Sequence, residues 1–460
     1  MNIKSRLISM SFLQFFVWGA WLITIANYWF GTKGWEGTQF GLVFGTMGIA
    51  SLFMPTITGI IADRWINAEK LYAGLHLMYA AVLFYIPQVD NPSTFVYIML
   101  LAMCFYMPTI ALSDSISYNV LKNSGKDVVK DFPPIRVWGT IGFIAAMWLT
   151  NLSGSKASEY QFYIAGVGAV ILGLYSLTLP ACKPQNLTKK DSSWTETLGL
   201  GAFKLFADYK ILLFFIFSMF LGGALQLTNA YGDVFLDEFK FFPKYTSSFV
   251  VEYSTIIMSI SQFSETLFIL AIPFFLRKFG IKQVMLISML AWVLRFGLFA
   301  YGNPTDGLWM IIMSCVVYGM AFDFFNISGS LFIETSTDAK NRSSAQGLFM
   351  MMTNGFGAVL GSFTSGWAID KFFTKTFTNT TEIAGFLETE TTNSTLLGFI
   401  KKQGIEIAAN GAFDNPILMK DWHSIWLSFA VYSLIIAIAF AIMFKHKHDP
   451  NHIPEGTTTH

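Results

Sequence analysis

Two polar side chains, Gln262 and Glu265, lie within an apolar run, TIIMSISQFSETLFILAI, that covers residues 255–272 and is long enough to cross a bilayer. An acid near the middle of a bilayer costs roughly 2.5 to 3.5 kcal/mol even on insertion scales. A spacing of three residues places both side chains on one face of a helix, and that face must meet protein or water. The rest of the chain is therefore expected to supply a polar cavity.

Other apolar runs carry polar or aromatic side chains at helical spacing. Arg136, Thr140 and Phe143 follow one another at intervals of four and three residues, so they share one helix face. Gln226 and Asn229 are three residues apart in a later run. We expect each of these helices to turn its polar stripe inward. The remaining polar or aromatic residues of this kind are Arg295, Tyr318, Phe322, Asp323 and Asn326.

Carboxamides, a hydroxyl, aromatic rings, a guanidinium and two acids suit a neutral, hydroxyl-rich ligand with a flat ring. Amides would pair with ring edges and hydroxyls, while Phe143 or Phe322 would cover a face of the ring. A structural interpretation stays open, because carboxamides also join transmembrane helices by hydrogen bonds. For Arg295 we favour a structural role as a partner of a carboxylate or carbonyl. Asp114, flanked by serines, is either part of a structural polar patch or a further proton-binding group.

Composition places these residues in a membrane protein. Hydrophobic residues make up 53% of the chain and charged residues 13%, against about 25% charged in soluble domains. The formal net charge of +1 offers no basic surplus for nucleic acid. Three cysteines without ligand-like spacing indicate neither a disulfide framework nor a metal site, and we expect no cofactor. The chain also has no HExxH or GxSxG motif, so we do not expect an enzyme.

The apolar runs predict an all-α polytopic protein with twelve transmembrane helices in two six-helix halves. We expect an N-terminal half at 1–180, a cytoplasmic linker at 181–208, a C-terminal half at 209–445 and a cytoplasmic tail at 446–460. A Thr-, Asn- and Glu-rich insert at 371–421 separates the last two helices. The predicted helices are near 8–30, 38–62, 70–87, 94–119, 133–152, 161–180, 209–233, 247–275, 281–301, 308–333, 343–369 and 423–444.

Basic residues predict the orientation of these helices. Most loop lysines and arginines fall on one side of the twelve-helix arrangement. The short loops of the other side hold Lys33, Lys156, Lys240 and Lys244. The positive-inside rule then places both termini in the cytoplasm and the 371–421 insert outside.

The loop after the second helix, GIIADRW, carries Gly59, Asp63 and Arg64 at the spacing of the major facilitator signature. We read these three residues as gating or structural positions. The alternative is an ordinary charged turn at the end of a membrane helix.

Longer runs extend this resemblance over nearly the whole chain. SFLQFFVWGAWL, DFPPIRVWGTIGF, FFIFSMFLGGALQLTN, TIIMSISQFSETLFIL, LRFGLFAYG, YGMAFDFFNISGS and AQGLFMMMTNGFG resemble the nucleoside:proton symporter family of the major facilitator superfamily. The resemblance implies a bacterial inner-membrane importer, monomeric in the bilayer, that takes up nucleosides such as uridine and adenosine with protons. The nucleoside-contacting residues it implies are Arg136, Thr140, Phe143, Gln226, Asn229, Gln262, Glu265, Tyr318, Phe322 and Asp323. Two features depart from the family pattern, a longer 371–421 insert and Asp114 where an asparagine is expected.

The proton-coupling candidates are Asp323, Glu265 and Asp114. We interpret Glu265 mainly as an acceptor for ligand hydroxyls, because it shares a face with Gln262. We interpret Asp323 as the coupling acid, which Arg136 of the other half could reach. Two alternative functions stay open, a major facilitator transporter of a sugar or drug and a receptor that binds nucleosides without moving them.

Overall fold

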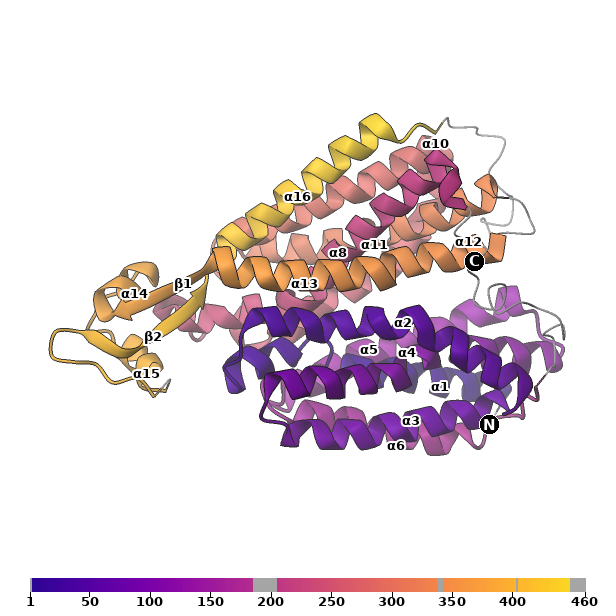
Figure 1. Ribbon diagram of the computed structural model, residues 1–460, viewed down its shortest axis with the longest axis horizontal. Helices are drawn as coiled ribbons and strands as arrows, with labels where there is room; N and C mark the ends of the chain where they lie inside the picture. Colours follow the sequence, from indigo (N-terminus) through magenta and orange to yellow (C-terminus); the bar gives the residue numbers. More distant parts are fainter. Residues whose placement is uncertain (1, 185–204, 338–341, 403, 447–460) are drawn as a thin grey trace.

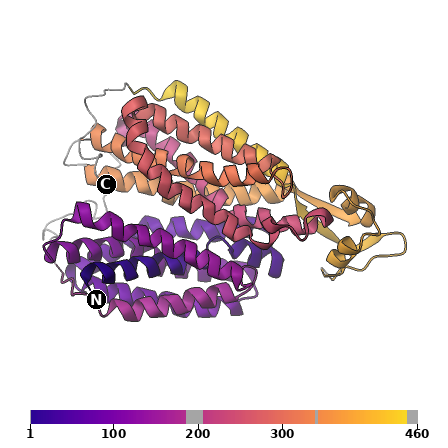
Figure 2. The same ribbon diagram turned by 180° about the vertical axis from the view of Figure 1, so that it is seen from behind.

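The structure of the chain is a computed structural model that describes residues 2–184, 205–337, 342–402 and 404–446. Most of the predicted linker (185–204) and nearly all of the predicted tail (447–460) lie outside the described residues. Figure 1 shows two bundles of helices side by side, and Figure 2 shows the same two bundles from behind.

The first bundle contains α1 to α6. A polar network centred on the Gln14 side chain lies within it. Its Nε2 donates to Thr109 Oγ1 at 2.9 Å, and its Oε1 accepts from the Tyr72 hydroxyl and is hydrogen-bonded to His76 Nε2. Buried polar groups of this kind need such partners, so the network fixes α1, α3 and α4 against one another. The elements are α1 (Ile3–Gly19), η1 (Asn27–Thr32), α2 (Gly37–Arg64), α3 (Ala68–Tyr85), η2 (Ile86–Gln88), α4 (Pro92–Asn123), α5 (Val128–Leu152) and α6 (Tyr160–Ser176).

The second bundle contains α8 to α13 and α16. Its helices pack around Phe214, Trp292, Phe296 and Trp426, which are buried. The elements are α8 (Tyr209–Glu238), η4 (Phe239–Phe241), η5 (Pro243–Tyr245), α9 (Phe249–Glu252), α10 (Ser254–Tyr301), α11 (Leu308–Ser336), α12 (Arg342–Met350), η6 (Met351–Gly357), α13 (Ala358–Ala368), η7 (Ile369–Phe373) and α16 (Trp422–Met443).

These elements make the twelve crossings that the sequence predicts, with three local differences. The first crossing is broken between α1 and η1, and α12, η6 and α13 together form the eleventh. The two predicted helices at 247–275 and 281–301 run on as α10, in which Gly280 alone leaves helical geometry with φ 77°. Glycine adopts this left-handed backbone without steric cost, so the chain turns between two crossings there. In the described part, seven helices are individually long and apolar enough to span a bilayer.

The 371–421 insert, expected within an all-α fold, contains a two-stranded antiparallel sheet as well as helices. It consists of β1 (Thr374–Asn379), α14 (Thr380–Phe386), α15 (Ser394–Lys402) and β2 (Ala412–Lys420). Phe377, Ile383 and Leu396 form its small core, against which Phe241 of η4 and the following Phe242 pack. Figures 1 and 2 show it projecting from the end of the molecule opposite to the start of α1 and the end of α16. We call this the insert end.

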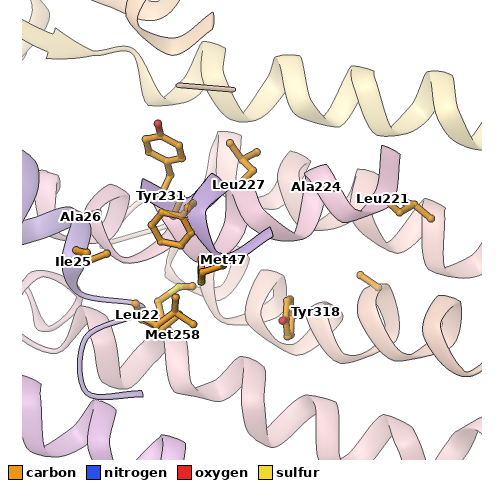
Figure 3. Close-up of a cluster of buried hydrophobic side chains, with 14 of the residues drawn as sticks. Leu22, Ile25, Ala26, Met47, Leu221, Ala224, Leu227, Tyr231, Met258 and Tyr318 are labelled. Carbon is orange, nitrogen blue, oxygen red and sulfur yellow. The ribbon is translucent and has the colours of Figure 1, made fainter. Parts of the chain in front are cut away.

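The two bundles contact each other along α2 with α13 and along α5 with α10. One hydrophobic cluster continues across both bundles, and Figure 3 shows part of it, with Leu22 and Met47 of the first bundle and Tyr231 and Met258 of the second. Hydrogen bonds between the bundles gather toward the insert end. Trp148 Nε1 donates to Ser259 Oγ at 2.9 Å, and Asn151 Nδ2 donates to the carbonyl of Glu252 at 2.9 Å.

Candidate functional site

The Arg136 end of the polar stripe of α5 reaches the second bundle, because α5 packs on α10 and Arg136 interacts electrostatically with Glu265 of α10. The Arg136 guanidinium lies 4.0 Å from the centre of the Phe15 ring. Phe143 is buried edge-on against Trp18, with ring centres 6.2 Å apart. Thr140 is half-buried and forms no side-chain hydrogen bond within the described residues. This stripe therefore brings a cation next to α10 and carries a hydroxyl without a partner, whereas Phe143 packs within the first bundle.

The carboxamides of α8 and α10 lack protein partners. Gln226 is buried, and its Oε1 has no hydrogen-bond partner among the described residues. The Oε1 of Gln262 is equally buried and unpartnered, although the residue as a whole is half-buried. Asn229 is half-buried and forms no side-chain hydrogen bond in the described part of the chain. An interhelical hydrogen bond, the structural alternative for these amides, is not formed by any of the three in this conformation.

Two acids and a tyrosine lie where α10 and α11 cross. A side chain on Gly319 would come within 2.5 to 2.6 Å of the backbone of Ser264 and Glu265, so glycine permits this close approach. Ser264 Oγ donates to the carbonyl of Val316 and fixes the crossing. Glu265 then interacts electrostatically with both Asp323 and Tyr318.

Aromatic rings line α11 beside these acids. Tyr318 and Phe322 stack with ring centres 5.9 Å apart and an angle of 8°, and Trp292 packs edge-on against Tyr318. Phe322 and Asn326 also line a small pocket together with Leu225 of α8. A flat ligand ring entering between α8 and α11 would thus meet parallel aromatic surfaces.

Arg136 and Asp323, which the sequence suggests as partners, form no ion pair among the described residues in this conformation. The charged group with which Asp323 interacts is Glu265, whereas Arg136 interacts with Glu265 and Asp114. Asp323 is buried, and its Oδ2 has no hydrogen-bond partner among the described residues. The α10–α11 crossing brings Glu265 of α10 close to Asp323 of α11.

Asp114 does not use the hydroxyls beside it in α4. Ser113 Oγ donates to the carbonyl of Ile110 at 2.8 Å, and Ser117 Oγ donates to the carbonyl of Ser113 at 2.8 Å. Asp114 is half-buried and interacts electrostatically with Arg136. Both interpretations of this acid stay open, but the local serines do not satisfy it.

Arg295 has the structural surroundings that we favoured. It is fully buried, donates from Nη1 to the carbonyl of Ser314 at 2.6 Å and lies over the Tyr318 ring at 4.6 Å. Gly59, Asp63 and Arg64 lie near the end of α2, where both charged side chains are exposed. Their gating role stays a prediction.

A network between the bundles at the insert end was missed from the sequence. Lys156, in the loop between α5 and α6, forms an ion pair with Asp237 of α8 at 2.8 Å and donates to the carbonyl of Val251 at 2.6 Å. Nearby, Asn27 Nδ2 of the first bundle donates to Asp233 of the second. We call these four side chains, Lys156, Asp237, Asn27 and Asp233, the outer network. Its signal in the sequence was two acids four residues apart at the end of an apolar run.

Twelve crossings in two bundles, with buried polar side chains left without partners among the described residues, define a membrane transporter of the major facilitator fold. A family model described as "Nucleoside H+ symporter" matches residues 1–449. The chain belongs to this nucleoside H+ symporter family.

Individual relatives agree with the family. The nucleoside permease NupG of Escherichia coli (strain K12) is 46% identical over 460 residues, which cover 100% of this chain and 99% of the relative. The xanthosine permease of the same organism is 45% identical and is covered fully. The crystal structure of the nucleoside transporter NupG (D323A mutant) superposes with a TM-score of 0.84 at 45% identity, covering 96% of this chain and 100% of that chain.

Proposed function

We propose that this protein imports nucleosides together with protons, and that the residues predicted on α5, α8, α10 and α11 bind the nucleoside. One observation carries the assignment of the site: the predicted polar side chains have no hydrogen-bond partners within the described protein. Oxygens of Gln226, Gln262 and Asp323 are buried and unpartnered. A buried polar group without a hydrogen bond costs about 1 to 3 kcal/mol, so a ligand that pairs with these groups gains binding free energy. Family membership and the permease relatives support the nucleoside as that ligand.

Competition for uptake tests this function. Cells or proteoliposomes containing the protein should accumulate labelled uridine under an inward proton gradient. Unlabelled nucleosides such as adenosine should compete. Free bases and sugars should compete much less, because each carries only one of the two polar parts of a nucleoside and leaves site residues unpaired. Equal competition by sugars would point instead to a sugar transporter.

The proposed mechanism is alternating access between the two bundles, taken as residues 1–180 and 209–445. The bonds that join the bundles gather toward the insert end, and this supports a conformation closed there and open toward the other end. With both termini cytoplasmic in a bacterial inner membrane, the conformation is inward-facing. We further propose that a single chain suffices, because both bundles of the site come from one polypeptide.

The first prediction concerns the carboxamides. Gln226→Ala and Gln262→Ala should each weaken nucleoside binding by about 1 to 3 kcal/mol, because an amide that pairs with a buried ligand edge is lost. Isothermal titration of folded, purified variants with uridine measures the change. Gln88→Ala is the matched control, since Gln88 is exposed at the end of η2 and its side chain bonds, among the described residues, only to the carbonyl of Phe84. Unchanged affinity in both site variants would place the nucleoside elsewhere.

A second prediction concerns orientation. A cysteine at Asn415, exposed in the insert, should react with a membrane-impermeant maleimide added to intact cells. A cysteine at Lys122, exposed at the opposite end of α4, should react only after permeabilisation. The native cysteines are buried or half-buried, so the parent protein gives a low background. Labelling of position 122 in intact cells would reverse the proposed orientation.

A further inference from the structure

A second pocket lies at the insert end, away from the residues assigned to the nucleoside. Its volume is about 280 Å³, at the lower limit of pockets that bind small molecules. Three parts of the chain form its wall: the segment around η1 in the first bundle, the end of α8 in the second bundle, and α15 with β2 of the insert. The pocket therefore depends on both bundles and on the insert at the same time.

Three of the four acids that line this pocket already have partners, and the fourth, Glu36, is exposed to solvent. Asp237 pairs with Lys156 and Lys240, and Glu238 accepts from Lys420 at 3.0 Å and from Trp422 Nε1 at 2.7 Å. Asp370 accepts from the backbone N–H of Gly37 at 2.9 Å and from Thr38. A charged ligand would compete with these buried pairs, and an anion would also be repelled by Glu36, so a neutral ligand is favoured.

One buried polar side chain of the pocket wall has an atom without a hydrogen-bond partner. Asn27 is 1% exposed and lines the pocket, and its Nδ2 donates to Asp233. Its Oδ1 is buried without a hydrogen-bond partner among the described residues. An unpaired buried acceptor favours a ligand that brings an N–H or O–H donor.

Aromatic surface completes the wall. Phe30 and Trp35 come from the first bundle, Phe241 from η4 after α8, and Phe399 from α15. The Lys420 ammonium lies 3.7 Å from the centre of the Phe30 ring, which holds this ring at the boundary between the bundles. Several rings around one small volume select a planar, ring-bearing solute over an aliphatic one.

We propose that this pocket is a capture site, in which a nucleoside binds from outside before the bundles open to admit it to the central site. The ligand class follows from the three features above: neutral charge, a donor for Asn27 and a flat ring. Because Asp237 belongs both to the pocket wall and to the outer network, the occupied pocket lies directly over the contacts that must break for opening. The inference rests on the proposed function and on the proposed orientation.

Gly31 allows a direct test. It lines the pocket, and a Cβ atom there would meet nothing within 4 Å, so Gly31→Ala adds one methyl group without a clash, whereas Gly31→Phe adds a ring at the pocket wall. Gly31→Phe should raise the KM for external uridine about fivefold, the loss of roughly one aromatic contact surface. Gly31→Ala should transport like the parent protein. Uridine binding to the central site of purified protein, measured by titration, should be the same in both variants.

Saturation-transfer NMR detects the capture site itself. A protein carrying Gln226→Ala and Gln262→Ala, with a weakened central site, should still give a uridine signal, and adding Gly31→Phe should reduce it. An unchanged KM in Gly31→Phe, or a signal that Gly31→Phe does not reduce, overturns the capture site. Ile405→Trp fills the pocket from the insert side and replaces Gly31→Phe if that variant does not fold. Failure of the parent protein to accumulate uridine would overturn the proposed function instead, so the two failures are distinguishable.

Discussion

Asp323→Asn is expected to abolish accumulation of nucleoside against a gradient while leaving nucleoside binding and exchange measurable. The Asp323 carboxyl is buried beside Glu265, and one of its oxygens has no protein partner. Two ionised carboxylates next to each other in such a site repel strongly, so a bound proton stabilises the pair. An amide at position 323 keeps the shape and the hydrogen-bonding capacity of the protonated acid, but it cannot release a proton.

Proteoliposomes with an imposed pH gradient separate the two activities. Asp323→Asn should show no uphill uptake of labelled uridine, while exchange of internal for external uridine continues. Asp90→Asn is the matched control, because Asp90 is exposed and pairs with Lys33 at the surface. Gradient-driven accumulation by Asp323→Asn would move the coupling role to Glu265 or Asp114.

Glu265→Gln should give the opposite pattern in the same assay. Glu265 lies next to Arg136 of the other bundle and shares a helix face with Gln262, so it is placed to accept ligand hydroxyls. Its loss should therefore weaken uridine binding more than it weakens coupling. Equal binding by Glu265→Gln and the parent protein would contradict this division of roles.

The sequence predicts the helices of this site better than the contacts between them. Polar residues three or four apart in apolar runs, such as Gln262 and Glu265, predict which helix faces are inward, because only that arrangement avoids lipid. The partner of Arg136 could not be predicted in the same way. It depends on how closely α11 approaches α10 at Gly319, and one glycine among 37 in the chain does not reveal such a crossing.

The insert and the outer network were predicted least well, for a related reason. β1 pairs with β2 across an interval that contains two helices, and the apolar side of this small domain packs on Phe241 and Phe242. Such long-range pairing leaves only a weak local pattern. Lys156 was interpreted from its sequence position as one of four loop lysines outside the membrane, yet in the fold it enters the boundary between the bundles.

Lys156→Met should shift the protein strongly away from the conformation closed at the insert end. The Lys156 side chain is 15% exposed and Asp237 is 5% exposed, so the pair is largely removed from water. Removing one partner of a buried ion pair costs about 3 to 5 kcal/mol. Because Lys240 still contacts Asp237 in this variant, we expect a cost at the lower end of that range. Lys156 also bonds to the carbonyl of Val251 and to Ser254 at 3.1 Å, both in the second bundle. A cost of about 3 kcal/mol changes the ratio of the two conformations more than a hundredfold.

Spin labels on Tyr160 and Phe249, exposed at the insert end in opposite bundles, report this change as a distance. In Lys156→Met the distance should lengthen, and transport should slow because the closed conformation is rarely reached. Lys240→Met is the matched control: Lys240 contacts the same Asp237, but it belongs to the same bundle and is 34% exposed, so its loss should change neither distance nor rate appreciably. Replacing Asp237 by Asn together with Lys156→Met removes the uncompensated charge and should restore part of the closed population. An unchanged distance in Lys156→Met would mean that the apolar contacts around Met258 and Tyr231, rather than the outer network, hold this end closed.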